Sequence, residues 1–443
     1  MSIISQLTKS LPKNTVISGS ENTRPFECDG LSVYKQEPLA VVLPSEVSQI
    51  KKVLEICRKH HTPVVTRGAG TGLSGGAMPL KDSVVLGLSK LTKVISINPE
   101  SRLAVVQPGV RNLAISEAAE QYGLYYAPDP SSQIACTIGG NVAENAGGVH
   151  CLKYGLTFQN IESLKMLTID GEELLFSRED EGLGLLALMT GSEGLLGVIT
   201  EITVKLTPKP ELAKLVMAGF DSVRDCADAV ADIIKNGVIP AGLEMMDAFA
   251  IEAAEDFAKP GYPLDAKALL LCELDGSTEL VNNDVSMVKT LLSKATSIRV
   301  SKTEEERLLL WKGRKSAFPA VGRLSPDYYC MDGTIPKRYL GDVLEEINQL
   351  SRQYNLRVAN VFHAGDGNLH PLILYDAGIP GELEKTEELG NKILKFCVQA
   401  GGSITGEHGV GIEKLDAMCY QFSEAELRSE ERRVGKECRS RWS

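Results

Sequence analysis

The residues best suited to chemistry lie in two short segments of the last hundred positions. Residues 362–372 read FHAGDGNLHPL and place His363 and His370 seven positions apart around a GDGN core. Each glycine would cost a helix about 1 kcal/mol relative to alanine, and an odd separation in a straight strand sends two side chains to opposite faces. Asp-Gly and Gly-Asn are turn dipeptides. We therefore predict a sharp bend that lets both imidazoles converge on one point.

The second segment, GGSITGEHGVG at residues 401–411, supplies Glu407 and His408. Two imidazoles and a carboxylate are the ligand set of a divalent metal site with open positions, able to bind Zn, Mn or Fe. A histidine also has the intrinsic pKa of a general base near neutral pH. The alternative is a group of hydrogen-bonded polar residues without a ligand, and the residue pattern alone leaves both open.

Glycine-rich stretches must position a larger ligand. Gly70, Gly72 and Gly75 fit G-x-G-x-x-G directly after a strand, but a dinucleotide-binding Rossmann unit also needs a helix there. Gly76 and Pro79 forbid that helix, so we predict a nest of backbone N–H groups able to hold a pyrophosphate, with an ordinary turn as the alternative. Residues 127–155 and 190–200 are similar, and a stretch as long as 127–155 without regular periodicity is usually functional.

Regular elements surround these stretches. Ser45 is expected to N-cap a helix over 46–61, with Val47, Ile50, Leu54 and Cys57 on one face. Strands are expected at 38–44, 62–68, 82–88 and 197–208, hairpins at 93–109 and 161–177, and a helix at 110–123. After residue 210 the texture changes to helices at 221–237, 279–295 and 339–355 with strands at 268–276 and 356–363, which predicts a second α+β domain.

Bulk composition limits the function. The 443 residues carry a net charge of −11, which disfavours nucleic acid and anionic membrane surfaces as partners. We find no apolar stretch long enough to span a bilayer and no secretory leader, so the cytoplasm is expected. Ten cysteines without a C-x-x-C pair indicate neither a disulfide scaffold nor an iron–sulfur cluster.

Residues 428–443, RSEERRVGKECRSRWS, break with the rest of the chain. They carry six basic and three acidic residues, so residues 1–427 carry −14. The string looks like one reading frame of a common sequencing adapter, and the alternative is a solvated basic tail. We expect an artefact and a missing natural C-terminus.

Five segments in this order resemble the glycolate oxidase D-subunit group of FAD-linked oxidases, whose relatives include D-lactate and D-2-hydroxyglutarate dehydrogenases. The segments are RGAGTGLSGGA, PDPSS…TIGGNVAENAGG, GSEGLLGVIT, FHAGDGNLH and GEHGVG. The resemblance covers about residues 20–420. It implies an α+β, two-domain architecture: an FAD-binding PCMH-type domain of the vanillyl-alcohol-oxidase fold at 1–210 (core about 36–210), and an α/β FAD-linked oxidase C-terminal cap domain at 211–427.

The resemblance also assigns FAD contacts to the glycine-rich stretches. The first loop lacks the histidine through which some relatives hold FAD, so non-covalent FAD is expected. The implied cofactor-binding residues are Arg67, Gly68, Ala69, Gly70, Thr71, Gly72, Leu73, Ser74, Gly75, Gly76, Pro128, Asp129, Ser131, Ser132, Ile138, Gly139, Gly140, Ala143, Asn145, Gly147, Gly148, Val198 and Ile199.

By the same resemblance, His363, His370 and Glu407 are metal ligands, and His408 takes the hydroxyl proton of a 2-hydroxy acid. We expect Arg314 in WKGRKSAF to bind the substrate carboxylate, because arginine binds carboxylates bidentately; the alternative is a surface arginine in a basic cluster. Asn368 is expected to add a polar contact. Tyr328, Tyr329 and Asp332 are expected to shape the pocket.

The implied activity is oxidation of glycolate or D-lactate to the 2-keto acid. Alternatives are a D-2-hydroxyglutarate-type dehydrogenase, a flavin-carrying subunit inactive alone, and a sugar-alcohol or aldose oxidase. The two histidine-bearing motifs argue against a subunit without acid-site histidines. Electrons would pass to a partner iron–sulfur subunit beside a second flavin-fold subunit, to a quinone or to oxygen. Peripheral association with the inner face of the membrane is the alternative to a purely cytoplasmic location.

Overall fold

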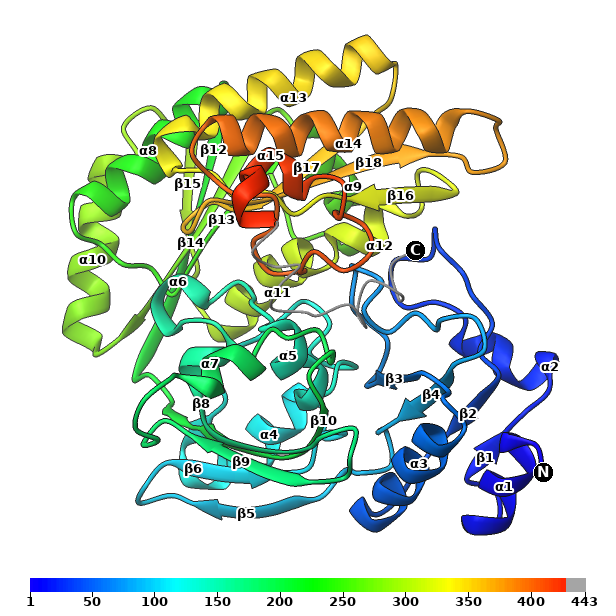
Figure 1. Ribbon diagram of the computed structural model, residues 1–443. Coiled ribbons are helices and arrows are strands. Elements are labelled where there is room, and N and C mark those ends of the chain that lie inside the picture. Colours follow the sequence, from blue (N-terminus) through cyan, green and yellow to red (C-terminus); the bar gives the residue numbers. More distant parts are fainter. Residues whose placement is uncertain (428–443) are drawn as a thin grey trace.

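A computed structural model describes residues 1–427 and shows two lobes, one above the other (Figure 1). The adapter interpretation of 428–443 falls outside the described residues. The lower lobe holds the elements up to β10, and the upper lobe is built on the sheet that begins with β12. The predicted boundary near residue 210 is not tested by this arrangement and stays a prediction.

A four-stranded sheet at the start of the chain carries the first glycine-rich loop. Its strand order is β1-β2-β4-β3, and β4 pairs in parallel with both β2 and β3. Val42, Leu86, Ile50 and Leu54 bury the sheet against helix α3. The elements are α1 (Ile3–Ser10), β1 (Val16–Ile17), α2 (Ser20–Thr23), β2 (Ala40–Val42), α3 (Val47–Lys59), β3 (Val64–Arg67) and β4 (Val84–Gly87).

The predicted N-cap of α3 is wrong. The helix begins at Val47 with Glu46 in the cap position, and no side chain caps it. The backbone N–H of Ser45 instead donates to the Gln49 side chain at 3.0 Å. Of the four apolar positions predicted for one face of this helix, Ile50, Leu54 and Cys57 are fully buried. Val47, in the first turn, is only partly buried.

A five-stranded antiparallel sheet, ordered β5-β6-β10-β8-β9, confirms both predicted hairpins and the strand after residue 197. The stretch 127–155, for which no element was predicted, contains two short helices, of which α5 is rich in small residues. The elements are β5 (Val94–Asn98), β6 (Leu103–Val106), α4 (Asn112–Ala119), β7 (Leu124–Tyr125), α5 (Ile138–Glu144), α6 (Cys151–Tyr154), β8 (Ile161–Leu167), β9 (Glu173–Ser177), α7 (Leu185–Met189), β10 (Val198–Lys205) and β11 (Thr207–Pro208).

A seven-stranded antiparallel sheet, ordered β15-β12-β14-β13-β17-β18-β16, forms the upper lobe. Its strands are β12 (Leu212–Phe220), β13 (Gly242–Asp247), β14 (Ala268–Gly276), β15 (Ser297–Val300), β16 (Asp327–Cys330), β17 (Val358–His363) and β18 (Asn368–Tyr375). The predicted mixture of helices and strands after residue 210 is confirmed.

Helices cover both faces of this sheet (Figure 1). The upper face packs against α8 (Val223–Lys235), α10 (Thr278–Leu291), α13 (Leu340–Tyr354) and α14 (Glu382–Gln399). The opposite face, toward the first lobe, packs against α9 (Ala248–Ala258), α11 (Glu304–Lys315) and α12 (Ala317–Val321). A short helix, α15 (Met418–Gln421), follows the GEHGVG segment. Helix α11 therefore lies between the large sheet and the glycine-rich loops.

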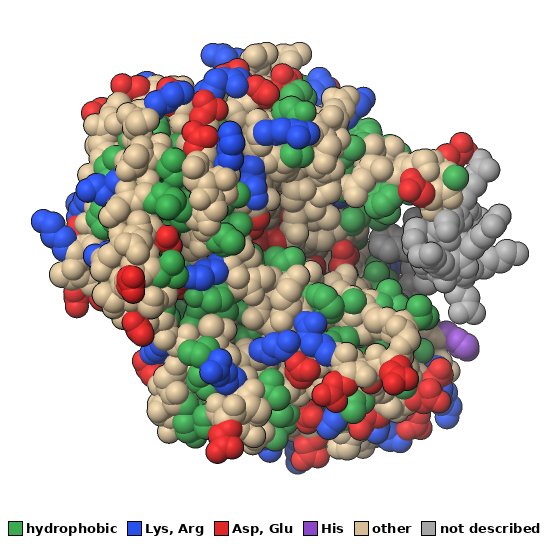
Figure 2. Space-filling model, turned by 90° about the vertical axis from the view of Figure 1, so that its left-hand side faces the viewer, with side chains coloured by type: hydrophobic (Ala, Val, Ile, Leu, Met, Phe, Trp, Pro, Cys, Tyr) green, Lys and Arg blue, Asp and Glu red, His purple; other side chains and the backbone are tan. Residues whose placement is uncertain are grey.

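Acidic and basic side chains are interspersed over the face in Figure 2, a pattern different from the continuous basic stripe of nucleic-acid-binding proteins. Within residues 1–427 no helix has both the length and the apolar character needed to cross a membrane.

A buried ionic network joins the two lobes at His150. Its Nδ1 lies 2.9 Å from an Asp129 oxygen, and its Nε2 lies 3.1 Å from a Glu273 oxygen of β14. Lys315 and Arg307 of α11 complete the network, at 3.0 Å from Asp129 and 2.7 Å from Glu273. Burial opposes the charged imidazole, but the two carboxylates outweigh it and raise the pKa of His150 to about 10. His150 is therefore cationic at neutral pH.

Replacing His150 with phenylalanine should lower the free energy of unfolding by about 3 kcal/mol, the usual cost of removing one partner of a buried ion pair. Because the folded-state pKa is raised, this contribution is complete below the unfolded value of 6.5 and disappears as the pH rises through about 10. Urea unfolding of both proteins at pH 7 and pH 10.5 measures the difference. Lys52→Ala, which removes an exposed pair with Glu55, is the control and should cost under about 1 kcal/mol. An equal loss from His150→Phe at both pH values would show that packing, not charge, is responsible.

Candidate active site

The bend predicted between the two histidines is present. Strands β17 and β18 form an antiparallel hairpin, in which His363 lies opposite Asn368 and His370 lies opposite Val361. Side chains of paired residues share a face, as do residues two apart on one strand, so both imidazoles lie on the same face of the sheet. Their ring centroids are 5.0 Å apart and the planes are nearly perpendicular. Gly367 makes the turn at φ +84°, where a Cβ would lie 2.2 Å from the Ile335 carbonyl oxygen.

Glu407 meets both histidines through one oxygen. Its Oε1 lies 2.9 Å from His370 Nε2 and 3.4 Å from His363 Nε2. The opposite ring nitrogens already have acceptors, since His363 Nδ1 lies 2.8 Å from Glu244 Oε1 and His370 Nδ1 lies 3.3 Å from the Met331 carbonyl oxygen. An imidazole that donates through Nδ1 presents a lone pair at Nε2, which a carboxylate repels. Positive charge, as protons or as a metal ion, must therefore lie between the three groups.

This arrangement fits a metal ion. The three ligand atoms of His363, His370 and Glu407 all lie within 4.8 Å of one another. Histidine ligands of metals usually donate their second ring N–H to a carboxylate or a backbone carbonyl, as Glu244 and Met331 accept here. Cys330, His370 and His408 form a second group by the same distance criterion. Burial raises the pKa of the Cys330 thiol well above its usual range, which disfavours the thiolate that a metal needs. The first group is therefore the better candidate.

His408 has the properties of a base. Its ring stacks on His370 at 4.9 Å between centroids, and its Nε2 is 4.0 Å from Glu407 Oε1. Burial lowers the pKa of His408 to about 4, although Asp332 opposes the shift. The Nδ1 atom is buried and has no hydrogen-bond partner among the described residues. The imidazole is therefore neutral at pH 7 and has a ring nitrogen free to accept a proton, although its lowered pKa makes it a weaker base than the ordinary histidine expected from the sequence.

Asp332 holds the segment that carries Glu407 and His408. Its carboxylate accepts backbone N–H groups of Gly406, Glu407 and His408 at 2.9–3.3 Å. Lys414, also fully buried, donates to Asp332 Oδ2 at 3.2 Å. Asp332 was expected to shape the pocket, but it does not line the cavity. It instead holds the backbone of residues 406–408 in place. Tyr328 lines the cavity, whereas Tyr329 is buried in the core of the upper lobe.

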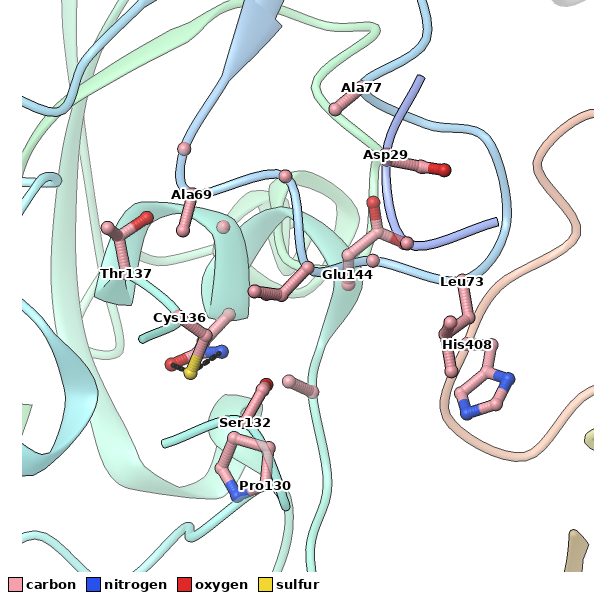
Figure 3. A pocket seen from close by; sticks show the side chains of 18 of the residues that line it. Asp29, Ala69, Leu73, Ala77, Pro130, Ser132, Cys136, Thr137, Glu144 and His408 are labelled. Carbon is pink, nitrogen blue, oxygen red and sulfur yellow. Dashed lines mark hydrogen bonds between the residues drawn. The ribbon is translucent and has the colours of Figure 1, made fainter. Parts of the chain in front are cut away.

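A cavity of about 750 Å³ connects this cluster with the glycine-rich loops (Figure 3). His363, His370, Glu407 and His408 lie on its wall. The predicted cofactor residues that also line it are Arg67, Gly68, Ala69, Gly70, Thr71, Gly72, Leu73, Gly76, Ser131, Ser132, Gly139, Gly140, Ala143, Gly147 and Ile199. The others do not line it: Ser74, Gly75, Pro128, Asp129, Ile138, Asn145, Gly148 and Val198. Asp129 instead belongs to the His150 network.

The cavity has the backbone of an anion-binding nest. No helix follows β3, as predicted, and β4 is the next element. Within residues 1–427, the backbone N–H groups of residues 69–73 donate to no protein acceptor. Gly68 lets the first loop approach Thr137 closely, because a Cβ at this position would lie 2.3 Å from Thr137 Oγ1. Without a Cβ, the backbone of the loop is also open to a ligand. A row of free N–H groups is what a pyrophosphate requires.

Unpaired polar atoms point to the same conclusion. Asp29 Oδ2, Thr137 Oγ1 and Glu144 Oε2 are buried without hydrogen-bond partners among the described residues, and all three side chains line the cavity. In Figure 3 they lie around the first glycine-rich loop and α5. A buried polar atom without a partner costs about 1–3 kcal/mol. The residues present therefore fit a large polar ligand such as FAD.

Two predicted contacts look different in the structure. Arg314 lines the cavity and is fully buried, so the alternative of a surface arginine is excluded, but its Nη2 already lies 2.5 Å from Glu244 Oε2. Its Nε has no hydrogen-bond partner among the described residues. Asn368 is absent from the cavity wall, because its amide packs behind the GEHGVG turn, where a Cβ on Gly406 would lie 2.5 Å from it. Its position does not support a direct contact with a bound molecule.

The sequence interpretation missed Glu244 and gave Glu144 no individual role. Glu244 lies on β13 between Arg314 and His363 and is fully buried. The only signal was a glutamate within the apolar run of residues 241–246, where a charge must have a partner. Glu144 lies at the end of α5, which sequence periodicity did not reveal.

Comparisons with known proteins agree with the resemblance. Residues 38–177 match the family described as FAD binding domain, and residues 209–432 match FAD linked oxidases, C-terminal domain. The chain is 58% identical over 431 residues to the glycolate oxidase subunit GlcD of Escherichia coli (strain K12), covering 96% of this chain and 86% of that protein. It is 38% identical to GlcD of Bacillus subtilis (91% and 89%) and 30% identical to a D-lactate dehydrogenase of Anaerostipes hadrus (95% and 91%).

Solved structures share the fold. A p-cresol methylhydroxylase structure aligns with a TM-score of 0.80 at 17% identity, covering 97% of this chain and 92% of that one. A 4-ethylphenol oxidase from Gulosibacter chungangensis aligns with a TM-score of 0.78 at 17% identity, covering 97% and 93%. These matches confirm the predicted two-domain, PCMH-type α+β fold. The chain belongs to the FAD-linked oxidase family that includes the glycolate oxidase subunit GlcD.

Proposed function

We propose that the protein oxidises a small 2-hydroxy acid, glycolate or D-lactate, to the 2-keto acid with non-covalently bound FAD. The observation that carries this proposal is a single cavity with a nest of free N–H groups on one wall and the His363–His370–Glu407–His408 cluster on another. The names of the relatives, glycolate oxidase subunit and D-lactate dehydrogenase, support this substrate class.

Each residue of the cluster has a distinct role in this proposal. His408, neutral at pH 7, accepts the proton of the substrate hydroxyl. His363, His370 and Glu407 would hold a divalent ion (Zn, Mn or Fe), which would lower the pKa of a hydroxyl bound to it. FAD, when bound, supplies the acceptor for the hydrogen and the two electrons removed from C2. Asp332 fixes the position of the base by binding the backbone around it.

Arg314 is the proposed partner of the substrate carboxylate. Part of its guanidinium is occupied by Glu244, and its Nε is unpaired among the described residues. The neighbouring cation on α11, Lys315, is held by Asp129 at 3.0 Å. A dicarboxylate such as 2-hydroxyglutarate would need a second clamp, and Lys315 is already paired. We therefore favour a monocarboxylate.

Arg314→Lys should raise KM for glycolate or D-lactate by about tenfold or more, with a smaller change in kcat, because a lost carboxylate contact weakens ground and transition states together. Lysine keeps a positive charge for Glu244, whereas Arg314→Met would remove the cation beside its buried Oε2, leave only His363 as a partner and destabilise the protein. Steady-state kinetics with a dye acceptor measure both parameters. An unchanged KM would remove Arg314 from substrate binding.

The proposed function is tested by anaerobic mixing with D- and L-2-hydroxy acids. The purified protein should be yellow, and glycolate or D-lactate should bleach the visible absorbance of the oxidised flavin. Acid precipitation should release the flavin as FAD, and flavin that stays in the pellet would show a covalent link. Bleaching only by a dicarboxylate would favour the alternative D-2-hydroxyglutarate activity. No bleaching by any acid would favour a subunit inactive alone.

The electrons taken from the substrate must leave the flavin for an acceptor. Among the described residues, the two histidine-containing groups are the ones close enough to hold a metal, and neither has the four cysteines of an iron–sulfur cluster. We propose that electrons leave to a partner subunit, a quinone or oxygen. The word subunit in the name of the 58% identical relative supports a partner protein.

A further inference from the structure

Glu144 is a buried acid in the cavity to which the proposed mechanism gives no role. It lies at the C-terminal end of α5, between the first glycine-rich loop and the GEHGVG segment. A Cβ on Gly76 would lie 2.8 Å from Glu144 Oε1, and one on Gly409 would lie 3.2 Å from Oε2. The side chain therefore fills the space between these two segments, as Figure 3 shows for its position beside Asp29 and Leu73.

A second carboxyl group faces Glu144 across Gly409. Glu193 Oε1 would lie 2.6 Å from a Cβ on that glycine. Glu193 accepts the backbone N–H groups of Val410 at 2.9 Å and of Gly411 at 3.0 Å. Two N–H donors stabilise the ionised form of a carboxyl group. Glu193 is therefore held in place by backbone donors of the GEHGVG segment.

Glu144 has no comparable support for a negative charge. Its Oε2 is buried without a hydrogen-bond partner, and within the described part of the chain no cation forms an ion pair with it. The side chains of Asp29 and Glu193 lie near enough to act on it, and Lys414, a cation that also acts on it, is bound to Asp332. Burial first, and Glu193 next, raise the pKa of Glu144 to about 8. Lys414 and the Ser74 hydroxyl lower this pKa, but by less than burial and the neighbouring carboxyl groups raise it, so the carboxyl group of Glu144 keeps its proton at pH 7.

We propose that Glu144 is a neutral acid whose O–H donates a hydrogen bond to the bound FAD. An ionised carboxylate at this position would repel the pyrophosphate, whereas a carboxylic acid can donate to an oxygen or nitrogen acceptor of the cofactor. The proposal rests on the proposed function, because FAD is the ligand. It adds a side-chain donor on the cavity wall to the backbone N–H groups of the first glycine-rich loop.

Replacing Glu144 with glutamine or alanine tests whether its side chain donates a hydrogen bond to FAD. Glu144→Gln keeps a neutral donor of nearly the same shape and should leave the dissociation constant of FAD within about threefold of wild type. Glu144→Ala removes the donor and should weaken FAD binding about tenfold, the value of one ordinary hydrogen bond. The measurement is the rise in flavin fluorescence as FAD leaves the diluted holoenzyme. Glu179→Gln, at an exposed position, controls for the loss of one negative charge.

The dependence on pH gives an independent readout. Wild-type FAD affinity should fall as the pH rises through about 8, where Glu144 ionises, and Glu144→Gln should lack this decrease. If Glu144→Gln binds FAD as weakly as Glu144→Ala, the residue acts as an anion or as a structural element, and the proposal is wrong. A wild-type protein that holds no FAD would instead overturn the proposed function, so the two failures are distinguishable.

Discussion

Replacing His408 with asparagine should lower the rate of flavin reduction by roughly 10²–10⁴, the usual contribution of a positioned base. Asparagine preserves polarity and approximate size but cannot accept the proton at pH 7. The backbone N–H of residue 408 would still donate to Asp332, so the segment should keep its conformation. Stopped-flow absorbance under anaerobic conditions measures the single reduction step, while FAD content and substrate binding should be close to wild type.

His61→Asn is the matched control for this variant. His61 is exposed and has a φ of +51°, a conformation that asparagine also tolerates. The control should reduce flavin at the wild-type rate. Rapid bleaching by His408→Asn would take the base role from His408 and leave it to another group on the cavity wall.

Removing the metal should lower turnover by at least about 10²-fold while FAD stays bound, because the proposed ion acts on the substrate and not on the cofactor. Treatment with a chelator should have this effect, and Zn or Mn should restore activity. His363→Ala and His370→Ala should reproduce the chelated state without recovery. Metal analysis and flavin absorbance of the same purified sample distinguish loss of the metal from loss of FAD.

Glu244→Gln provides the graded control. Glu244 orients His363 through Nδ1 without belonging to the ligand group. Loss of such an outer partner typically weakens metal binding by about 10–100-fold, so excess metal should restore this variant but not His363→Ala. Full activity of a metal-free preparation would contradict the metal site and leave the histidines as hydrogen-bonding residues.

Local patterns predicted the parts of the molecule that depend on local physics. The GDGN turn, the two early hairpins and the absence of a helix after Gly76 follow from turn residues and from the alternation of apolar residues. The position of the three proposed metal ligands and of most glycine-loop residues around one cavity agrees with the motif resemblance. Such a resemblance carries information that the periodicity of one sequence does not contain.

The missed features all depend on contacts between distant segments. Asp332 supports residues 406–408 from 74 to 76 positions away, and Glu244 joins Arg314 to His363 across the large sheet. Helix α5 lies against the cavity and against Pro108, and this close approach requires small residues. The helix therefore lacks the apolar stripe by which a helix is recognised in a sequence. Asn368 was expected to add a polar contact, but its amide packs against Gly406, a contact between segments 38 positions apart.

The cavity wall draws on residues from Asp29 to His408, and this span has a consequence for biosynthesis. Domains generally fold in order of synthesis, with the N-terminal part first. The first lobe can form its glycine loops while the upper lobe is still being translated. At that stage the part of the cavity wall formed by Arg314, the hairpin histidines and Glu407 has not been synthesised. Tight retention of the cofactor therefore has to wait until residues 401–411 have left the ribosome. Ribosome-bound chains ending before residue 400 should exchange FAD freely, and loading should be a late event in the life of each molecule.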